Sequence, residues 1–395
     1  MFSLKFKSNS QGLTPQWETK LALESSGQKV IDLTGSNPTT VGLDYPLDLP
    51  ALLNNQSVLL YQPDPRGLLS AREAIAEYYR SRGRNYRAED LLLTASTSEA
   101  YAFLFKLLCD PGDEIWIPSP TYPLFDALAE LENIDLIRYP VRATFKKSGC
   151  TWDPDMEFLR KQMSTRCKAL ILVNPNNPTG HVASPEEIRA YLDLAAEYHL
   201  ALIVDEVFCE YLLGDAIFYP MESTGPLVFT LNGFSKLLGL PQLKLGWIHI
   251  AGAADNVEEA QNYLEWISDT YLSVNSPVQL ATPGLLKLGP VIQVNIKNRV
   301  KSNLLRAEII MGKSKLVRLV KPAAGWYVIM QINLPVEDEI FALQLLKKYH
   351  VQTYPGVLFG FEDECWLVLS LLGLENEFEM GLNHILTFAA EYQKD

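Results

Sequence analysis

The stretch from Val228 to Ile250, VFTLNGFSKLLGLPQLKLGWIHI, places a lysine between two apolar runs. The first run, 228–231, is rich in β-branched and aromatic residues and ends in a turn, which predicts a strand. The second run, 245–250, follows a loop that contains glycine and proline. A lysine at a strand end must be paired or lose its charge if it is buried. Lys236 is therefore either a surface residue at a turn or a less basic amine that can form a Schiff base with a carbonyl.

Length, composition and charge narrow the class of protein. The chain of 395 residues is 48% apolar and 21% charged, which predicts a globular protein with room for a large domain and a smaller one. Its net charge of −13 argues against a nucleic-acid partner. No stretch is long and apolar enough to span a bilayer, and the first 13 residues do not resemble a signal peptide. The five cysteines have no metal-ligand or C-x-x-C spacing, so we expect free thiols in a cytoplasmic protein.

Short apolar runs alternate with helical patterns from about residue 90 onwards. The runs are 91–93, 114–117, 134–141, 169–173, 201–204, 228–231 and 245–250. This alternation predicts an α/β fold, in which a mostly parallel sheet is covered by helices on both faces. The last part of the chain mixes strands and helices, which predicts a smaller α+β domain. We expect an arm over residues 1–45 that also contributes to the small domain, a large domain over 46–275 and the small C-terminal domain over 276–395.

Polar residues follow two other predicted strands, where ligands of parallel sheets bind. Ser96, Thr97 and Ser98 come after the run 91–93 and open a helix. Small hydroxyl residues at this position are N-caps first, but together with the helix N–H groups they also suit a phosphate. Asn177 lies in a turn rich in asparagine and proline after another strand. A plain turn is one reading of this segment, and a rigid loop that offers an amide donor is the other.

A carboxylate directly follows the apolar run 201–204. Burying Asp205 there costs free energy unless it has a partner, and a distant arginine is the simplest one. The alternative is a carboxylate that keeps a ring nitrogen protonated, as a pyridine-type electron sink requires. An aldehyde-bearing cofactor with a phosphate and a protonated ring nitrogen would use this loop together with the loops described above and that of Lys236.

The order and spacing of several short motifs strengthen this hypothesis. They are Gly35-Ser36-Asn37-Pro38, Tyr61 with Gly67, residues 94–100, Pro111-Gly112-Asp113, residues 120–123, Asn177-Pro178-Thr179-Gly180, Asp205-Glu206, Ser235-Lys236, residues 244–247 and Tyr354-Pro355-Gly356. In this arrangement the chain resembles the pyridoxal-phosphate enzymes of fold type I, aminotransferase class I/II, which include aspartate aminotransferase. The resemblance implies pyridoxal 5'-phosphate as cofactor, a small-molecule amino donor and keto acceptor, and a homodimer.

The resemblance also implies roles for individual residues. Lys236 would form the internal aldimine and move a proton, Asp205 would pair with the pyridinium nitrogen, and Tyr122 would stack on the ring. Asn177 would bind the phenolic oxygen of the ring. The remaining cofactor contacts would come from Ser96, Thr97, Ser98, Phe208, Ser235 and Lys244, and from Tyr61 toward the phosphate of the neighbouring subunit.

Three positions depart from the family pattern. Phe208 stands where the family usually has a tyrosine that bonds the phenolic oxygen, and Lys244 stands where it usually has an arginine. Val368 occupies the position of the arginine that grips the substrate α-carboxylate, and no arginine follows Arg318. We therefore expect either a substrate without an α-carboxylate there, such as an amine, an amino-sugar-like molecule or a modified amino acid, or a substitute cation. Arg66, the region of the loop 35–40 or a neighbouring subunit could provide that substitute.

The sequence thus predicts a pyridoxal-phosphate-dependent aminotransferase with atypical substrate recognition. A lyase, decarboxylase or racemase of the same fold is an alternative, because the sequence does not reveal which substrate bond is broken. A non-catalytic sensor that binds the cofactor belongs to another class, and the presence of Lys236 and Asp205 argues against it.

Overall fold

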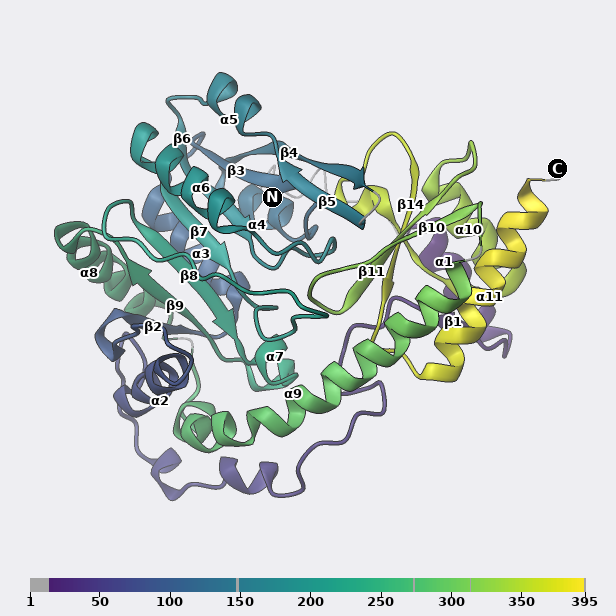
Figure 1. Cartoon of the computed structure of the whole chain (residues 1–395). Helices are drawn as coiled ribbons and strands as arrows, with labels where there is room; N and C mark the ends of the chain where they lie inside the picture. The colour runs from purple at the N-terminus through teal and green to yellow at the C-terminus, as the bar shows by residue number, and fades with distance from the viewer. Residues whose placement is uncertain (1–13, 147–148, 273, 313, 394–395) are drawn as a thin grey trace, which may run out of the picture.

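The computed structural model describes residues 14–146, 149–272, 274–312 and 314–393. Its larger half is built on an eight-stranded sheet with the strand order β2-β9-β8-β7-β6-β3-β4-β5 (Figure 1). The strands are β2 (Leu91–Thr94), β3 (Glu114–Ser119), β4 (Asp135–Lys146), β5 (Gly149–Pro154), β6 (Cys167–Val173), β7 (Ala201–Asp205), β8 (Val228–Gly233) and β9 (Gly246–Ala251). The five strands from β8 to β4 are parallel, whereas β9 and β5 run antiparallel to their neighbours. The expected mostly parallel sheet is confirmed.

Helices cover both faces of this sheet. They are α3 (Thr97–Leu108), α4 (Phe125–Glu132) and α8 (Ala254–Tyr271) on one face, and α2 (Leu69–Arg80), α5 (Met156–Gln162) and α6 (Pro185–Tyr198) on the other. In β7, Ile203 packs on the side of α3 and α8, whereas Leu202 and Val204 pack on the side of α6. Burying each of these side chains contributes about 1.5–3 kcal/mol. Burial on two faces explains why the strands are continuous apolar runs.

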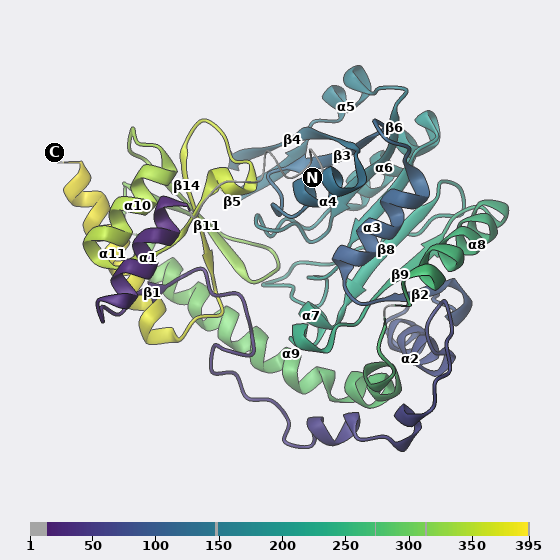
Figure 2. The ribbon, with the colours of Figure 1, turned by 180° about the vertical axis from the view of Figure 1, so that it is seen from behind.

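The smaller half contains an antiparallel sheet in the order β10-β11-β14-β13. Its elements are β10 (Val317–Val320), β11 (Tyr327–Ile332), α10 (Asp338–Tyr349), β13 (Tyr354–Pro355), β14 (Cys365–Ser370) and α11 (Glu375–Tyr392). The N-terminal segment joins this half, because α1 (Pro15–Ser25) packs on α10 and β1 (Ile31–Asp32) pairs with β12 (Val351–Gln352) (Figure 2). The single turns and 3-10 helices are η2 (Leu49–Leu53), η3 (Gln56–Leu59), η4 (Ala88–Asp90), α7 (Phe234–Leu237), η5 (Pro241–Leu243) and η6 (Gly356–Phe359).

One long helix, α9 (Ser276–Met311), connects the two halves (Figure 1). Near its start, the Gln279 side chain accepts a hydrogen bond from the backbone N–H of Leu68 in the larger half, at 2.6 Å. Near its end, Asn303 donates to the carbonyl oxygen of Leu371 in the smaller half, at 2.9 Å. We propose domains over residues 46–275 and 276–395, with residues 1–45 as the arm, because the second boundary coincides with the start of this helix.

Two details differ from the sequence-based expectation. The helical pattern in the sequence extends over residues 122–131, but α4 begins only at Phe125, because Tyr122 precedes Pro123 and a residue before proline avoids the helical region. The apolar run 134–141 is only the first part of β4, which continues into a hairpin with the unpredicted strand β5. Within the described ranges, no helix combines the length and hydropathy needed to cross a membrane.

Candidate active site

A cavity of about 440 Å³ opens where β2, β3, β6, β7 and β8 end, and residues of the smaller half also line it. It brings together every sequence-predicted site residue except Tyr61. These residues are Ser96, Thr97, Ser98, Tyr122, Asn177, Asp205, Phe208, Ser235, Lys236 and Lys244. Tyr327 and Tyr354 contribute from the smaller half. The chain therefore gathers its polar loops at one edge of the parallel sheet, as sheets of this kind do.

Tyr61 lies apart from this cavity. Its side chain is 78% exposed, and it lines a separate pocket beside Pro65 and Gly67. An exposed position does not conflict with a contact to a neighbouring subunit, which stays a prediction.

Lys236 is carried by the single-turn helix α7, directly after β8. Its Nζ lies 5.1 Å from the ring centroid of Trp326 and 5.8 Å from that of Phe208. Burial lowers the pKa of Lys236 to about 8, although the negative charge of Asp205 acts in the opposite direction. A substantial fraction of the amine is therefore neutral near pH 8, and a neutral amine is the form that attacks a carbonyl.

Asp205 ends β7 on the face of the sheet covered by α3. Its Oδ1 accepts a hydrogen bond from the backbone N–H of Val207, and its Oδ2 accepts one from the Tyr101 hydroxyl, both at 3.0 Å. Burial raises the pKa of Asp205 to about 6, while these bonds and the charge of Lys236 lower it. The carboxylate is thus held by neutral donors, in a position to interact with a cationic ligand in the cavity.

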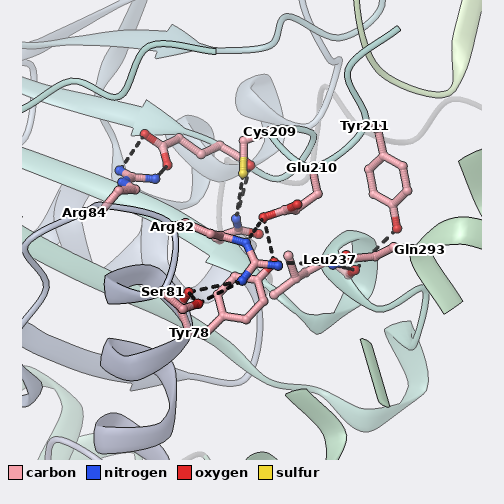
Figure 3. A network of polar contacts seen from close by, with 11 residues as sticks. Tyr78, Ser81, Arg82, Arg84, Cys209, Glu210, Tyr211, Leu237 and Gln293 are labelled. Atoms are coloured by element: carbon pink, nitrogen blue, oxygen red, sulfur yellow. Dashed lines mark hydrogen bonds and ion pairs between the residues drawn. The ribbon is translucent and has the colours of Figure 1, made fainter. Parts of the chain in front are cut away.

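The distant arginine that the sequence suggested for Asp205 pairs with its neighbour instead. Arg84 makes two hydrogen bonds to the Glu206 carboxylate, and the longer one, from Nη2 to Oε1, is 3.0 Å. The same Nη2 donates to the Tyr86 hydroxyl at 2.8 Å. Burial alone would lower the pKa of Arg84, but the carboxylate of Glu206 raises it above its ordinary value. Figure 3 shows Arg84 next to the polar network around Glu210.

The loop after β2 has two functions. The Ser96 side chain caps α3, because its Oγ accepts a hydrogen bond from the Glu99 backbone N–H at 3.1 Å. Thr97 and Ser98 are the first two residues of that helix and line the cavity. The first N–H groups of a helix lack partners within the helix, and its dipole favours an anion there. The N-cap reading therefore holds for Ser96, and the geometry of the next two residues suits a phosphate.

Other lining groups are available to a ligand. Asn177 is buried, and in the described parts of the chain its Oδ1 has no hydrogen-bond partner. Tyr122 is 43% exposed in the loop after β3. Lys244 is exposed at the edge of the cavity, in the left-handed conformation with φ of 55°. An unpartnered buried amide oxygen favours a polar ligand in the cavity, because such an atom otherwise costs about 1–3 kcal/mol.

Val368 belongs to the sheet of the smaller half. It is fully buried in β14, where its Cα pairs in register with Ile329 and Tyr354, and it does not line the cavity. Among the described residues that line the cavity, the cations are Lys236 and Lys244, and none is an arginine.

Arg66 does not replace the missing arginine within this chain. Its Nε donates to Glu265 at 2.7 Å and its Nη1 to the carbonyl oxygen of Glu89 at 3.1 Å, away from the cavity lining. The loop 35–40 contributes Ser36, which is uncharged.

Sequence analysis missed four residues around Lys236 and Asp205. They are Tyr101, Tyr211, Gln293 and Trp326. Each lies in an apolar or helical segment that predicts core packing, and each reaches the site from another element. The one signal in the sequence that could have indicated a role was the polar atom that each of them carries in otherwise apolar surroundings.

A less basic lysine and a buried carboxylate thus lie in one cavity at the end of a parallel sheet. The chain belongs to the aminotransferase class I and II family, whose model matches residues 30–385. It is an aminotransferase, and its family and fold imply dependence on pyridoxal phosphate. Of the alternatives considered from the sequence, family membership favours transamination.

Known proteins support this assignment along nearly the whole chain. The glutamate-pyruvate aminotransferase AlaA of Haemophilus influenzae is 26% identical over 392 residues, which cover 96% of this chain and 95% of that protein. The alanine aminotransferase of Mycobacterium bovis is 27% identical over 385 residues, which cover 94% of this chain and 88% of that protein. The structure of an Escherichia coli aminotransferase has a TM-score of 0.86 at 25% identity, covering 99% of this chain and 98% of that one. The Pyrococcus furiosus alanine aminotransferase shares the fold, with a TM-score of 0.89 at 24% identity over 99% and 100% of the two chains.

Proposed function

We propose that the chain transfers amino groups between small molecules by using Lys236 as the amine that bonds the aldehyde carbon of pyridoxal phosphate. The observation that carries the proposal is a half-buried lysine, with a pKa of about 8, in a cavity that the buried Asp205 also lines. The cofactor, when bound, supplies an aldehyde that exchanges amines and a protonated ring that withdraws electrons. The Lys236 amine then holds and moves the proton at the substrate carbon.

Other residues of the cavity fit the remaining parts of this cofactor. Asp205 accepts a hydrogen bond from the ring nitrogen and keeps it protonated. Thr97, Ser98 and Ser235 bind the phosphate, and Lys244 adds a positive charge beside it. Asn177 uses its amide toward the phenolic oxygen. This assignment is supported by the place of Asn177 in the cavity lining and by the helix start at Thr97.

Tyr122 and Phe208 complete the assignment. Tyr122 packs on the cofactor ring, which its half-open position at the cavity allows. Phe208 packs beside Lys236 and supplies no hydroxyl to the phenolic oxygen.

The amino donor is recognised without the usual arginine clamp. A guanidinium binds a carboxylate through two parallel hydrogen bonds, whereas the described lining of this cavity contains no arginine. Val368, at the position of the family's arginine, is buried in β14 outside that lining. The named relatives act on alanine, glutamate or pyruvate, according to their names. For this chain we propose a donor that has no α-carboxylate at this position, such as an amine, an amino-sugar-like molecule or a modified amino acid.

The assembly and the compartment are also proposals. A homodimer would place the exposed Tyr61 against a neighbouring cavity, and its 78% exposed side chain supports such a contact. All five cysteines are free thiols, which supports a cytoplasmic, reducing environment.

Trapping of the cofactor on Lys236 tests the proposed chemistry. Incubation with pyridoxal phosphate, borohydride reduction and peptide mapping should place the pyridoxyl group on Lys236. Lys236→Met should remove the label, whereas the matched variant Lys244→Met should keep the label on Lys236 with weaker cofactor binding. A label on another lysine, or none in the wild type, contradicts the assignment.

The substrate proposal is tested separately by half-reactions. Conversion of the visible cofactor band is followed with a panel of α-amino acids and a panel of amines. We expect faster conversion by amines, and Val368→Arg should shift the preference toward α-amino acids. Fast turnover of alanine, aspartate or aromatic amino acids that Val368→Arg leaves unchanged would show that this position does not decide specificity.

A further inference from the structure

The backbone that carries Lys236 is fixed by side chains from two other elements. The Tyr211 hydroxyl lies 2.8 Å from the carbonyl oxygen of Lys236 and 3.3 Å from that of Leu237. Gln293, on α9, donates from Nε2 to the carbonyl oxygen of Leu237 at 3.1 Å. Figure 3 shows both side chains directed at this short segment. We propose that Tyr211 and Gln293 are positioning residues that set the location of the Lys236 amine, an inference that rests on the proposed role of Lys236.

Helix α7 needs such support because it is only four residues long. The last carbonyl groups of a helix lack partners within it, and a single turn is not stable by itself. Its last turn is closed by bonds from the Leu238 N–H to the carbonyl oxygen of Phe234 and from the Gly239 N–H to that of Lys236, both at 3.2 Å. The two side-chain donors thus act on the carbonyl groups at its end, at Lys236 itself and at the next residue.

Gln293 is in turn held by a polar network. The Tyr78 hydroxyl, on α2, accepts from Gln293 Nε2 at 3.3 Å and donates to Glu210 Oε1 at 2.6 Å. Arg82 donates to the same Glu210 oxygen from Nε at 2.8 Å, and its guanidinium carbon lies 3.6 Å from the Tyr78 ring centroid (Figure 3). Because each member has a defined partner, the amide of Gln293 has a fixed orientation.

Helix α9 also approaches α7 closely enough for this contact. A Cβ added at Gly289, about one turn before Gln293, would lie 2.7 Å from Leu238 Cδ2. Tyr211 packs its ring edge-on against Trp326, with centroids 5.0 Å apart. The ring can therefore keep its packing when only the hydroxyl is removed, so Tyr211→Phe isolates the hydrogen bonds.

The test measures the amine of Lys236 in the cofactor-free protein. Competitive acetylation with acetic anhydride across a pH series, followed by peptide mapping, gives the pKa and reactivity of Lys236. Weaker anchoring of the backbone admits more water to the half-buried Lys236 ammonium, so Tyr211→Phe should raise that pKa by roughly 0.5–1. Gln293→Met should raise it less, and the double variant more than either.

Kinetics of the loaded enzyme provide a second measurement. With the best donor from the substrate panel, Tyr211→Phe should lower kcat about tenfold and leave KM within about twofold, because misplacing a reacting group costs rate more than binding. Tyr191→Phe, on α6, is the matched control: it removes a buried tyrosine hydroxyl that lies 3.1 Å from the Tyr139 hydroxyl. The control should change neither the pKa of Lys236 nor kcat.

The proposal is overturned if Tyr211→Phe and Gln293→Met both give the wild-type pKa of Lys236 in the acetylation series. If Tyr211→Phe does not fold, Gln293→Met decides by the same measurement. Failure of borohydride trapping in the wild type would remove the proposed function but leave the acetylation result unaffected, so the two failures are distinguishable.

Discussion

Asp205 and Glu206 are consecutive carboxylates at the end of one strand, but they have different kinds of hydrogen-bond partner. Glu206 is fully buried and bound by the Arg84 guanidinium through two hydrogen bonds. Asp205 accepts its hydrogen bonds from a backbone N–H and a tyrosine hydroxyl, on the other face of the sheet. Glu206 thus has an arginine partner, whereas Asp205 has neutral donors in its place.

The difference separates a structural charge from a functional one. A buried ion pair with both partners present is satisfied by the folded chain alone. Burial raises the pKa of both carboxylates, and Arg84 opposes this shift at Glu206 through direct hydrogen bonds. A buried carboxylate whose hydrogen-bond donors are neutral gains most from a cation that arrives with a ligand. The absence of a hydrogen-bonded cation at Asp205 among the described residues therefore indicates a role in the active site, whereas the ion pair of Glu206 with Arg84 indicates a role in the stability of the fold.

The largest expected effect is loss of stability in Glu206→Gln. This change leaves the Arg84 guanidinium buried without its counter-charge, so the free energy of unfolding should fall by about 3–5 kcal/mol. Urea unfolding of the cofactor-free protein measures it. The double variant Arg84→Met/Glu206→Leu should recover most of the loss, because no charge is then left unpaired. If the free energy of unfolding of Glu206→Gln is within about 1 kcal/mol of the wild-type value, the pair of Arg84 and Glu206 is not needed for stability.

Asp205→Asn should have the opposite character, with lost activity and gained stability. An amide does not keep the cofactor ring nitrogen protonated, so kcat should fall by about 10²–10³-fold, as for loss of one preorganised electrostatic contact. The amide can still accept from the Val207 N–H and donate to the Tyr101 oxygen. Activity of the loaded enzyme within about threefold of wild type would contradict the role of Asp205.

The stability gain of Asp205→Asn depends on pH. The folded-state pKa of Asp205, about 6, lies above its ordinary value of 3.8, so the protonated carboxyl is favoured by folding and this contribution is lost as pH rises through 6. The cofactor-free variant should therefore be more stable than the wild type by about 1–3 kcal/mol at pH 7–8. The gain should shrink as pH is lowered from 6 toward 4. Urea unfolding at several pH values checks this, and a gain that does not change with pH would count against the raised pKa.

The smallest expected effect concerns Phe208, which lies on the functional side of the comparison. Phe208→Tyr adds a hydroxyl donor toward the ionised phenolic oxygen of the bound cofactor, a bond worth about 1.5–3 kcal/mol. The pKa of the visible cofactor band should therefore fall by roughly 1–2 in the variant. Phe208→Leu is the control and should show no decrease. An unchanged or higher pKa in Phe208→Tyr would oppose this argument.

Local signals predicted much of the fold and of the cavity. The capping box at Ser184 and Glu187 marks the start of α6, and the structure contains both of its hydrogen bonds. The apolar runs mark the strands because both sheet faces are covered. The polar loops after those runs converge because parallel strands end at the same edge.

Partners from distant segments could not be predicted in this way. The pairing of Arg84 with Glu206 joins residues 122 positions apart, and that of Gln293 with Leu237 joins residues 56 apart. No local period encodes which buried cation meets which carboxylate. Tyr101 lies on an apolar helix face, so its hydroxyl contact with Asp205 is visible only after the helix is packed on the sheet.

The long helix α9 has a consequence for building hybrid proteins from this family. Its first turns belong to the packing of the larger half through Gln279, and its last turns belong to the smaller half through Asn303. A hybrid joined at residue 276 would take both ends of the helix from the donor of the smaller half. It would then replace the surface that faces α2 and the glutamine that reaches the carbonyl group beside Lys236. A junction inside the helix, after Gln293 and before Asn303, preserves both sets of contacts. The first part of α9 then comes from the same protein as the larger half, and the last part comes from the same protein as the smaller half.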